Sequence, residues 1–132
     1  MQAPSKEKTI LVVDDDPDIL RVVVALLANS EYNVLTAASG STALQQSRGY
    51  PGEIHLLLSD FQMPGMSGID LATAMTVERP ELKVLLMSAF DGGMLVLNEG
   101  WHFLAKPFIA SQLRALVLGL VFPDRKSQNF SK

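Results

Sequence analysis

Short, almost uniformly apolar runs alternate along the chain with segments whose apolar residues recur at helical spacing. The apolar runs predict β-strands, and they occupy residues 9–13, 32–37, 54–59, 83–88 and 102–105. The periodic segments predict helices. The first is capped by Asp15 or Asp16 and carries an apolar stripe over residues 19–27, and the others cover 40–48, 67–78, 94–99 and 109–121. Strand and helix are therefore expected to alternate from one end of the chain to the other.

This alternation favours an α/β fold built on one parallel sheet. Strands that are joined through helices run parallel with right-handed crossovers, so that helices lie on both faces of the sheet. A strand that is covered on both faces carries apolar side chains on both sides, which explains why polar residues are rare within the runs. We therefore expect a five-stranded parallel sheet with helices on both faces.

Polar side chains stand where four of these strands end. Asp14 and Asp15 follow the first strand, Asp60 follows the third, Ser88 closes the fourth and Lys106 follows the fifth. The carboxyl ends of parallel strands lie at one edge of an open sheet, where ligands bind. A buried carboxylate is unfavourable unless a partner neutralises it. The sequence therefore predicts one site for a divalent cation and a phosphoryl group.

Composition narrows the class of protein. The chain has 132 residues, enough for one domain with a sizeable core. No cysteine is present, which excludes disulfides and thiolate sites. His55 and His102 have no ligand-spaced partners, so we interpret them as strand-end residues and expect no zinc site. The net charge of -3 argues against direct DNA binding and against attraction to an anionic membrane.

Three segments are expected along the chain. Residues 1–8 are polar and predict a flexible N-terminal arm, residues 9–122 the folded domain, and residues 123–132 a polar C-terminal tail. The N-terminus lacks the apolar core of a signal peptide, and no apolar stretch is long enough to span a bilayer. We therefore expect a cytoplasmic protein.

Four motifs occur in a familiar order. They are Val12–Asp16, Ser59–Gly68, Met87–Ala89 and Leu104–Phe108. Together they resemble the receiver domain of bacterial two-component response regulators, of the chemotaxis-regulator type. The resemblance covers about residues 8–122, and each motif alone is much less specific than the four in sequence. It implies a flavodoxin-like fold with strand order 2-1-3-4-5.

The resemblance also implies a function. Asp60 matches the residue that accepts a phosphoryl group from a phosphohistidine on a sensor histidine kinase or a histidine phosphotransfer protein. Such a domain is a signalling switch and not a turnover enzyme, and some members form homodimers. Asp14 and Asp15 match the acidic pair that holds Mg²⁺, with Asp60 and the backbone carbonyl of Gln62 as further ligands. Hard oxygen ligands of this kind suit Mg²⁺.

Three further residues match the parts that respond to phosphorylation. Lys106 matches the lysine that contacts the phosphoryl group, and Ser88 matches the switch hydroxyl. Phe103 matches the switch aromatic, although a phenylalanine at a strand position also suits a plain core role. The resemblance implies that these residues reshape the surface of the segment after Ser88, the last strand and the last helix.

The chain departs from the family pattern in one region. The stretch from Ser88 to Lys106 is shorter than is usual in the family by roughly one helical turn. Gly92 and Gly93 loosen it further, and Trp101 stands where a small residue is common. We expect phosphoryl acceptance to survive these changes, but the usual dimerisation or output through that face is put in doubt. No output domain follows, so the chain is either a single-domain regulator or one piece of a larger protein such as a hybrid kinase.

Two alternatives remain open at this stage. A phosphohydrolase of the haloacid dehalogenase type would use Asp14 as the nucleophile, with Asp16, Ser88 and Lys106 in support. That family also needs an acidic pair after the lysine, where this chain has only Asp124, and it leaves Asp60 unexplained. The other alternative is a receiver-like module that binds a partner without being phosphorylated. The acidic residues after the first strand also suit a plain helix cap.

Overall fold

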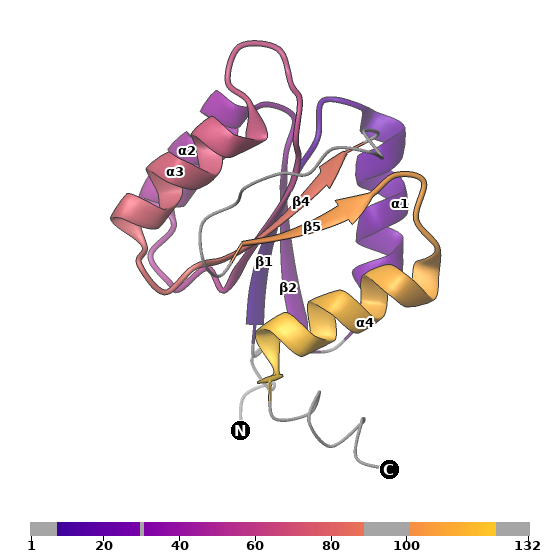
Figure 1. The fold of residues 1–132 in the computed structure, drawn as a ribbon. Coiled ribbons are helices and arrows are strands. Elements are labelled where there is room, and N and C mark those ends of the chain that lie inside the picture. Colours follow the sequence, from indigo (N-terminus) through magenta and orange to yellow (C-terminus); the bar gives the residue numbers. More distant parts are fainter. Residues whose placement is uncertain (1–7, 30, 89–100, 124–132) are drawn as a thin grey trace.

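The described residues form one parallel sheet with helices on both faces (Figure 1). A computed structural model describes residues 8–29, 31–88 and 101–123. The strands are β1 Lys8–Val13, β2 Tyr32–Ala37, β3 Leu56–Asp60, β4 Lys83–Ser88 and β5 Trp101–Ala105. The helices are α1 Pro17–Leu27, α2 Gly40–Gly49, α3 Gly68–Glu78 and α4 Ala110–Val121. The sheet has five strands in the order β2-β1-β3-β4-β5, which confirms the predicted fold and strand order.

The strands lie within two residues of their predicted positions. β2 and β4 have the predicted bounds, whereas β1 and β5 each begin one residue earlier than predicted. β3 begins at Leu56 instead of residue 54 and includes Asp60, because Asp60 still pairs with Met87 of β4. The acceptor candidate is therefore the last residue of a strand and not the first residue of a loop. Ladder pairing, which periodicity does not reveal, fixes such boundaries.

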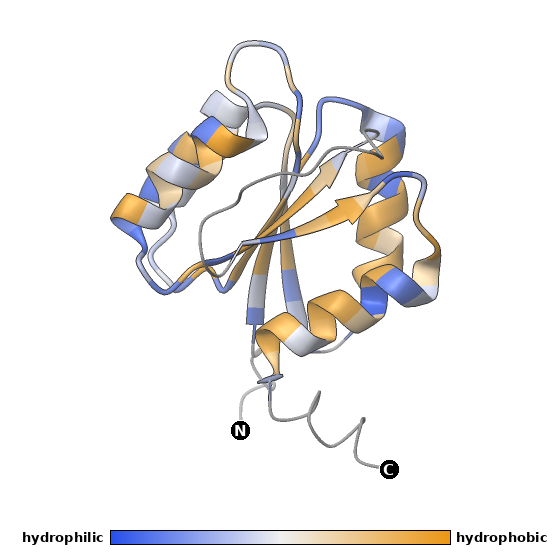
Figure 2. Cartoon of the chain, viewed as in Figure 1, coloured by the Kyte–Doolittle hydropathy of each residue, from blue (hydrophilic) through white to orange (hydrophobic). Residues whose placement is uncertain are grey.

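Two layers of helices explain why the strands are apolar throughout. In β1, Ile10 and Val12 belong to one hydrophobic cluster together with residues of α1 and α4. The alternate residues Leu11 and Val13 belong to a second cluster with residues of α2 and α3. Side chains that point to opposite faces are thus both removed from water. Figure 2 shows the strands largely hydrophobic, with hydrophilic residues near the starts of β1, β2 and β5.

Three helices begin at polar caps near the carboxyl edge of the sheet. The side chain of Asp16 accepts a hydrogen bond from the backbone N–H of Asp18 at 2.9 Å, and Pro17 occupies the first turn of α1. Ser39 caps α2 and Ser67 caps α3 in the same way. The caps satisfy donors that have no partner inside the helix. The sequence offered Asp15 or Asp16 as the cap, and the structure has Asp16.

Two arginines hold α2 and α3 together at the opposite edge. The guanidinium of Arg79 donates to the backbone carbonyls of Ser47, Tyr50 and Gly52 at 2.7, 3.0 and 2.9 Å. The carbonyls of Tyr50 and Gly52 follow the end of α2, and the carbonyl of Ser47 lies in its last turn, where it also accepts from the N–H of Tyr50. Arg48 pairs with Glu78 through Nη2 and Oε2 at 2.8 Å. The two helices are therefore linked by several directed contacts as well as by packing.

Some sequence predictions fall outside the described residues. The predicted helix 94–99, Gly92 and Gly93 lie in one such region, and residues 124–132 of the predicted tail lie in another. Among the helices that the structure describes, none has the length and apolar character that a membrane crossing needs.

His55 links the start of β1 to the residue before β3. The backbone N–H of Thr9 donates to Nδ1 of His55 at 3.0 Å, and the N–H of His55 donates to the carbonyl of Thr9 at 2.8 Å. Nδ1 can accept this bond only while it carries no proton. Partial burial and the charge of Lys8 lower the pKa of His55, while Glu53 opposes the shift. The histidine therefore acts as a neutral bridge between two strands.

We expect acid to weaken the fold through this bridge. Because the pKa of His55 lies below its ordinary value, the unfolded chain binds this proton first as the pH falls. The free energy of unfolding should fall between the ordinary and the lowered pKa and level off below, by about 1 kcal/mol for one lost hydrogen bond. Urea unfolding from about pH 8 to about pH 5 measures the slope. His55→Gln should reduce the dependence of the unfolding free energy on pH in this range, whereas His102→Gln should leave it unchanged. An equal pH dependence in the wild type and both variants would contradict the role assigned to His55.

Candidate functional site

Three carboxylates meet at the carboxyl edge of the sheet. Asp14 and Asp15 follow β1, and Asp60 ends β3. Because β1 and β3 are neighbours and Val13 pairs with Ser59, the next residues, Asp14 and Asp60, lie side by side. Each of the three carboxylates has an oxygen within 4.8 Å of the other two. The predicted meeting of these side chains is therefore observed.

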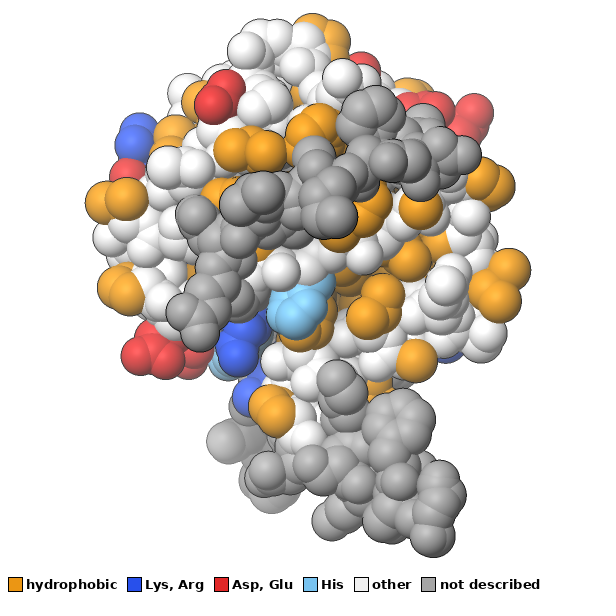
Figure 3. All heavy atoms as spheres, in the orientation of Figure 1, with side chains coloured by type: hydrophobic (Ala, Val, Ile, Leu, Met, Phe, Trp, Pro, Cys, Tyr) orange, Lys and Arg blue, Asp and Glu red, His pale blue; other side chains and the backbone are white. Residues whose placement is uncertain are grey.

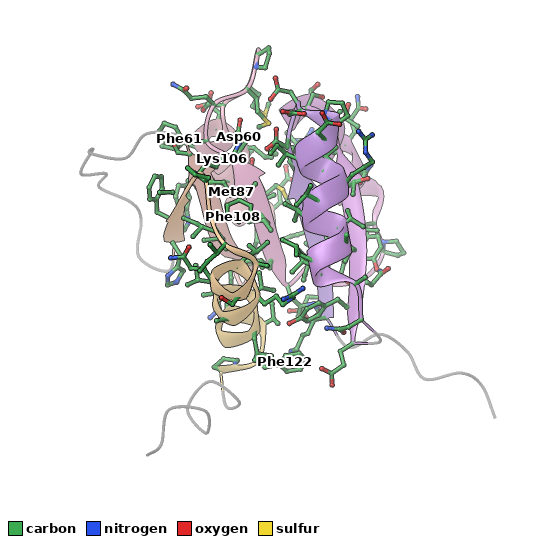
Figure 4. The ribbon with its side chains drawn as sticks, turned by 90° about the vertical axis from the view of Figure 1, so that its right-hand side faces the viewer. Asp60, Phe61, Met87, Lys106, Phe108 and Phe122 are labelled. Atoms are coloured by element: carbon green, nitrogen blue, oxygen red, sulfur yellow. The ribbon has the colours of Figure 1, made fainter. Side chains whose placement is uncertain are left out.

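Lys106 supplies the positive charge of the cluster. Its Nζ lies 2.9 Å from Oδ1 of Asp60 and 3.3 Å from Oδ2 of Asp14. The residue follows β5, and its backbone N–H donates to the carbonyl of Ser88 at 2.6 Å, which continues the pairing of β4 and β5. Figure 4 shows Asp60 and Lys106 together at one edge of the sheet, with Phe122 at the opposite edge.

Burial and charge shift the protonation of two of these groups. Asp14 is 1% exposed, and this burial raises the pKa of its carboxyl, to which the charge of Asp60 adds. The N–H of Asp16, which donates to Oδ1 at 2.9 Å, and the ammonium of Lys106 work in the opposite direction. Burial alone would lower the pKa of Lys106, but the contacts with Asp60 and Asp14 outweigh it and raise that pKa. Lys106 is therefore fully charged at neutral pH.

The donor set suits a hard divalent cation. Three carboxylates and one ammonium leave two negative charges uncompensated within the cluster. Asp15 is exposed, whereas Asp14 and Asp60 are largely buried, so the cluster opens to solvent on the Asp15 side. Mg²⁺ prefers carboxylate oxygens and keeps several of its own waters, which an exposed edge permits. The residues present therefore fit the predicted magnesium site.

The other predicted site residues have different surroundings. Ser88 is 4% exposed and ends β4 one residue beyond Met87, the partner of Asp60, which places it at the same edge. Gln62 lies two residues after Asp60, beside a shallow hollow of about 370 Å³ that Pro64 also lines. Phe103 lies within β5 and is half-buried against the α2–α3 side of the sheet. The roles of Ser88, Gln62 and Phe103 stay predictions.

Backbone contacts around Asp60 were not foreseen from the sequence. The hydroxyl of Ser59 donates to the carbonyl of Asp60 at 2.9 Å. The N–H of Phe61 donates to the carbonyl of Met87 at 2.7 Å, and the N–H of Gly68 donates to the carbonyl of Phe61 at 2.9 Å. A serine inside an apolar run and a glycine at a helix start were the available signals. These bonds hold the main chain on both sides of Asp60.

A comparison of the sequence with known protein families agrees with this geometry. The family model described as response regulator receiver domain matches residues 10–118. The chain belongs to this family. Receiver domains are the phosphoacceptor switches of two-component systems. The side chain of Asp16 caps α1, a structural role that differs from the one the phosphohydrolase alternative required of it. The receiver assignment is thereby favoured over that alternative.

Several proteins are similar to this receiver domain. The probable transcriptional regulatory protein TcrX of Mycobacterium tuberculosis is 33% identical over 124 residues, which are 88% of this chain and 52% of TcrX. The response regulator TrrA of Thermotoga maritima, solved in complex with Mg²⁺ and BeF, is 30% identical with a TM-score of 0.74, covering 86% of this chain and 98% of TrrA. A receiver domain protein from Clostridium thermocellum is 27% identical with a TM-score of 0.77, covering 89% and 97%.

The shared part is limited to the receiver domain. The chain spans about half the length of TcrX, and 18% of the length of a rice response regulator that it also matches. The activities that reside in the remaining parts of those proteins are therefore not carried over to this chain.

We expect Asp14→Asn to stabilise the metal-free receiver domain. A carboxyl whose pKa is raised by burial binds its proton more readily in the folded state, so its ionisation at neutral pH weakens the fold. The amide has the same shape without the charge and should raise the melting temperature by roughly 3 °C, or about 1 kcal/mol. Calorimetry in a chelating buffer measures this change. Asp70→Asn, on the exposed first turn of α3, serves as control, and a lower melting temperature for Asp14→Asn would contradict the interpretation.

Proposed function

We propose that Asp60 accepts a phosphoryl group from a phosphohistidine on a sensor histidine kinase or a histidine phosphotransfer protein. The observation that carries this proposal is the contact of Lys106 with both Asp60 and Asp14 at the carboxyl edge of the sheet. An ammonium placed between two carboxylates can hold the acceptor in place and also attract the anionic group that approaches it. The relatives with receiver domains support the same assignment.

The chemistry requires little beyond position and charge. An oxygen of Asp60 attacks phosphorus, the bond between phosphorus and the imidazole nitrogen breaks, and its electrons leave with that nitrogen. The product is an acyl phosphate on Asp60. Asp14, Asp15 and Asp60, with the backbone carbonyl of Gln62, would hold Mg²⁺, and the charge of the ion would offset the repulsion between the acceptor and the phosphoryl oxygens. TrrA was solved with Mg²⁺ and BeF, which supports this cofactor.

The chain's own residues do the remaining work. Lys106 shifts from its contact with Asp60 toward the new phosphoryl oxygens, which carry more charge than one carboxylate. The hydroxyl of Ser88 donates a hydrogen bond to one of those oxygens. The domain is thus a switch that assists its own phosphorylation, and turnover of a separate substrate is not part of the proposed role.

The signal leaves through the β5–α4 side of the domain. Lys106 connects the site to this side, because its N–H continues the ladder between β4 and β5. Movement of Ser88 would therefore reshape the surface around β5, and movement of Phe103, which packs on the α2–α3 side of the sheet, would change the other side of the same strand. This helix carries one charged residue, Arg114, and the described part of the face shows scattered hydrophobic side chains with few charges (Figure 3). Such a face suits a protein partner or a second copy of the chain better than DNA.

The site of phosphorylation can be tested directly. Incubation with acetyl phosphate and Mg²⁺ should add one phosphoryl group to the wild-type domain, seen by mass spectrometry. Asp60→Asn should abolish the adduct, while Asp70→Asn should keep it. Loss of the adduct only in Asp14→Asn would favour the phosphohydrolase. A wild-type protein without any adduct, whichever phosphodonor is used, would favour a module that acts without phosphorylation.

Metal binding can be tested separately from phosphorylation. A ligand that binds only the folded state raises its stability, by about 2.7 kcal/mol at one hundred times the dissociation constant. Millimolar-range Mg²⁺ should therefore raise the melting temperature by several degrees, roughly in line with that energy. The same salt should have little effect on Asp14→Asn, and equal amounts of K⁺ should have little effect on either protein. An unchanged wild-type melting curve would contradict the metal site.

A further inference from the structure

The loop that follows Asp60 packs on one glycine at its base and on another near its tip. We call residues 61–67 the acceptor loop, because it connects Asp60 to α3 and carries Gln62. Gly68 lies at the end of the loop, and Gly40, the first residue of α2, lies beneath Met66. Neither glycine contributes a side chain to the site. Both instead allow an approach that any larger residue would prevent.

At the base of the loop, Gly68 lies directly against the main chain of Asp60. A Cβ atom on Gly68 would lie 2.2 Å from the carbonyl oxygen of Asp60 and 3.1 Å from Cα of Phe61. These are main-chain atoms, so no side-chain rotation can relieve the overlap. The N–H of Gly68 donates to the carbonyl of Phe61 at 2.9 Å and closes the loop. The start of α3 therefore fixes the main chain of the acceptor.

The tip of the loop, at Met66, rests on a different helix. A Cβ atom on Gly40 would lie 2.8 Å from Cβ of Met66 and 3.0 Å from both its Cγ and its Sδ. Gly40 itself is held firmly, because Ser39 caps α2 and the following Ala43 is completely buried. Met66 thus lies directly over the backbone of α2. This contact joins the acceptor loop to a part of the fold that is distant in sequence.

The middle of the loop is also anchored. Met63 is 9% exposed and belongs to the same hydrophobic cluster as Ala43 of α2 and Leu71 of α3. Gly65 turns the chain with a φ of 83°, a conformation that suits glycine. Gln62 lies between the bonded Phe61 and the buried Met63, so its main chain has little freedom. The loop is fixed at its base, its middle and its tip.

We propose that Gly40 and Met66 are positioning residues for the acceptor loop. Their contact sets where the carbonyl of Gln62 stands relative to Asp14 and Asp60, and neither residue touches the phosphoryl group. A side chain at position 40 would push Cβ of Met66, and with it the loop, by several tenths of an ångström. Mg²⁺ tolerates little departure from its preferred geometry, so this shift weakens its binding. The inference rests on the proposed function of the site.

The chain offers a matched pair of substitutions as a test. Gly40→Ala and Gly49→Ala exchange the same residue types at the two ends of α2, but a Cβ on Gly49 would meet nothing within 4 Å. We expect Gly40→Ala to weaken Mg²⁺ binding roughly tenfold, as loss of an outer contact around a metal commonly does. Gly49→Ala should leave the affinity unchanged. Isothermal titration with MgCl₂ on the full chain measures both.

A second substitution separates the contact from other effects of position 40. Met66→Gly removes the Cβ, Cγ and Sδ atoms of Met66, which a side chain at position 40 would meet at 2.8 and 3.0 Å. In that background the additional cost of Gly40→Ala should be clearly smaller than in the wild-type background, because residues in contact do not act additively. An equal cost in both backgrounds would overturn the proposal. If Gly40→Ala does not fold, Met66→Gly alone must weaken Mg²⁺ binding.

A measurement without metal completes the test. In metal-free Gly40→Ala, the amide signals of Gln62, Met63 and Ser67 should shift in a ¹H–¹⁵N spectrum, whereas Gly49→Ala should leave them in place. Wild-type affinity or unshifted loop signals in Gly40→Ala would overturn the positioning role while leaving the proposed function intact. A wild-type protein that neither binds Mg²⁺ nor becomes phosphorylated would instead overturn the proposed function and, with it, this inference.

Discussion

The packing of three carboxylates around one ammonium is the constraint on which the rest of the structure depends. Asp14, Asp15 and Asp60 repel one another, and the raised pKa of Asp14 shows that burial adds to this cost. The cluster persists because the backbone of neighbouring strands holds its members in place, and because Lys106 reaches across from β5 to two of them. A site of this kind is unfavourable without counter-charge, and this cost is the reason why the proposed cation should bind there.

The fold tolerates this electrostatic cost because both faces of the sheet are buried. Strand residues that point to either face are buried, and the hydrophobic clusters extend from the sheet to all four described helices. The helix caps Asp16, Ser39 and Ser67 then place the ends of α1, α2 and α3 at the edge where the carboxylates meet. Arg79 closes the α2–α3 layer at the other edge. Stability is therefore drawn from the core and the far edge, while the site edge retains unbalanced charge.

The two halves of the domain contribute differently to the proposed switch. The α2–α3 half carries the acceptor loop and is tied down by Arg79, by Met63 and by the contact of Met66 with Gly40. The β5–α4 half is connected to the site through Lys106 and ends the sheet. A rigid half that holds the reacting group and an adjustable half that reports its state is a reasonable division for a two-state protein.

The sequence by itself determined the sheet, its faces and the list of residues at its edge. Apolar runs predicted the bounds of β2 and β4, and the acidic residues after β1 indicated Asp15 or Asp16 as the cap of α1, because these features depend on neighbours in sequence. Asp14, Asp60 and Lys106 could be brought together in advance because parallel strands end at a common edge. Only the tertiary structure decided that His55 accepts from Thr9, that Arg79 caps another helix and that Met66 rests on Gly40. These contacts join segments whose separation in space follows from packing, and local periodicity carries no information about it.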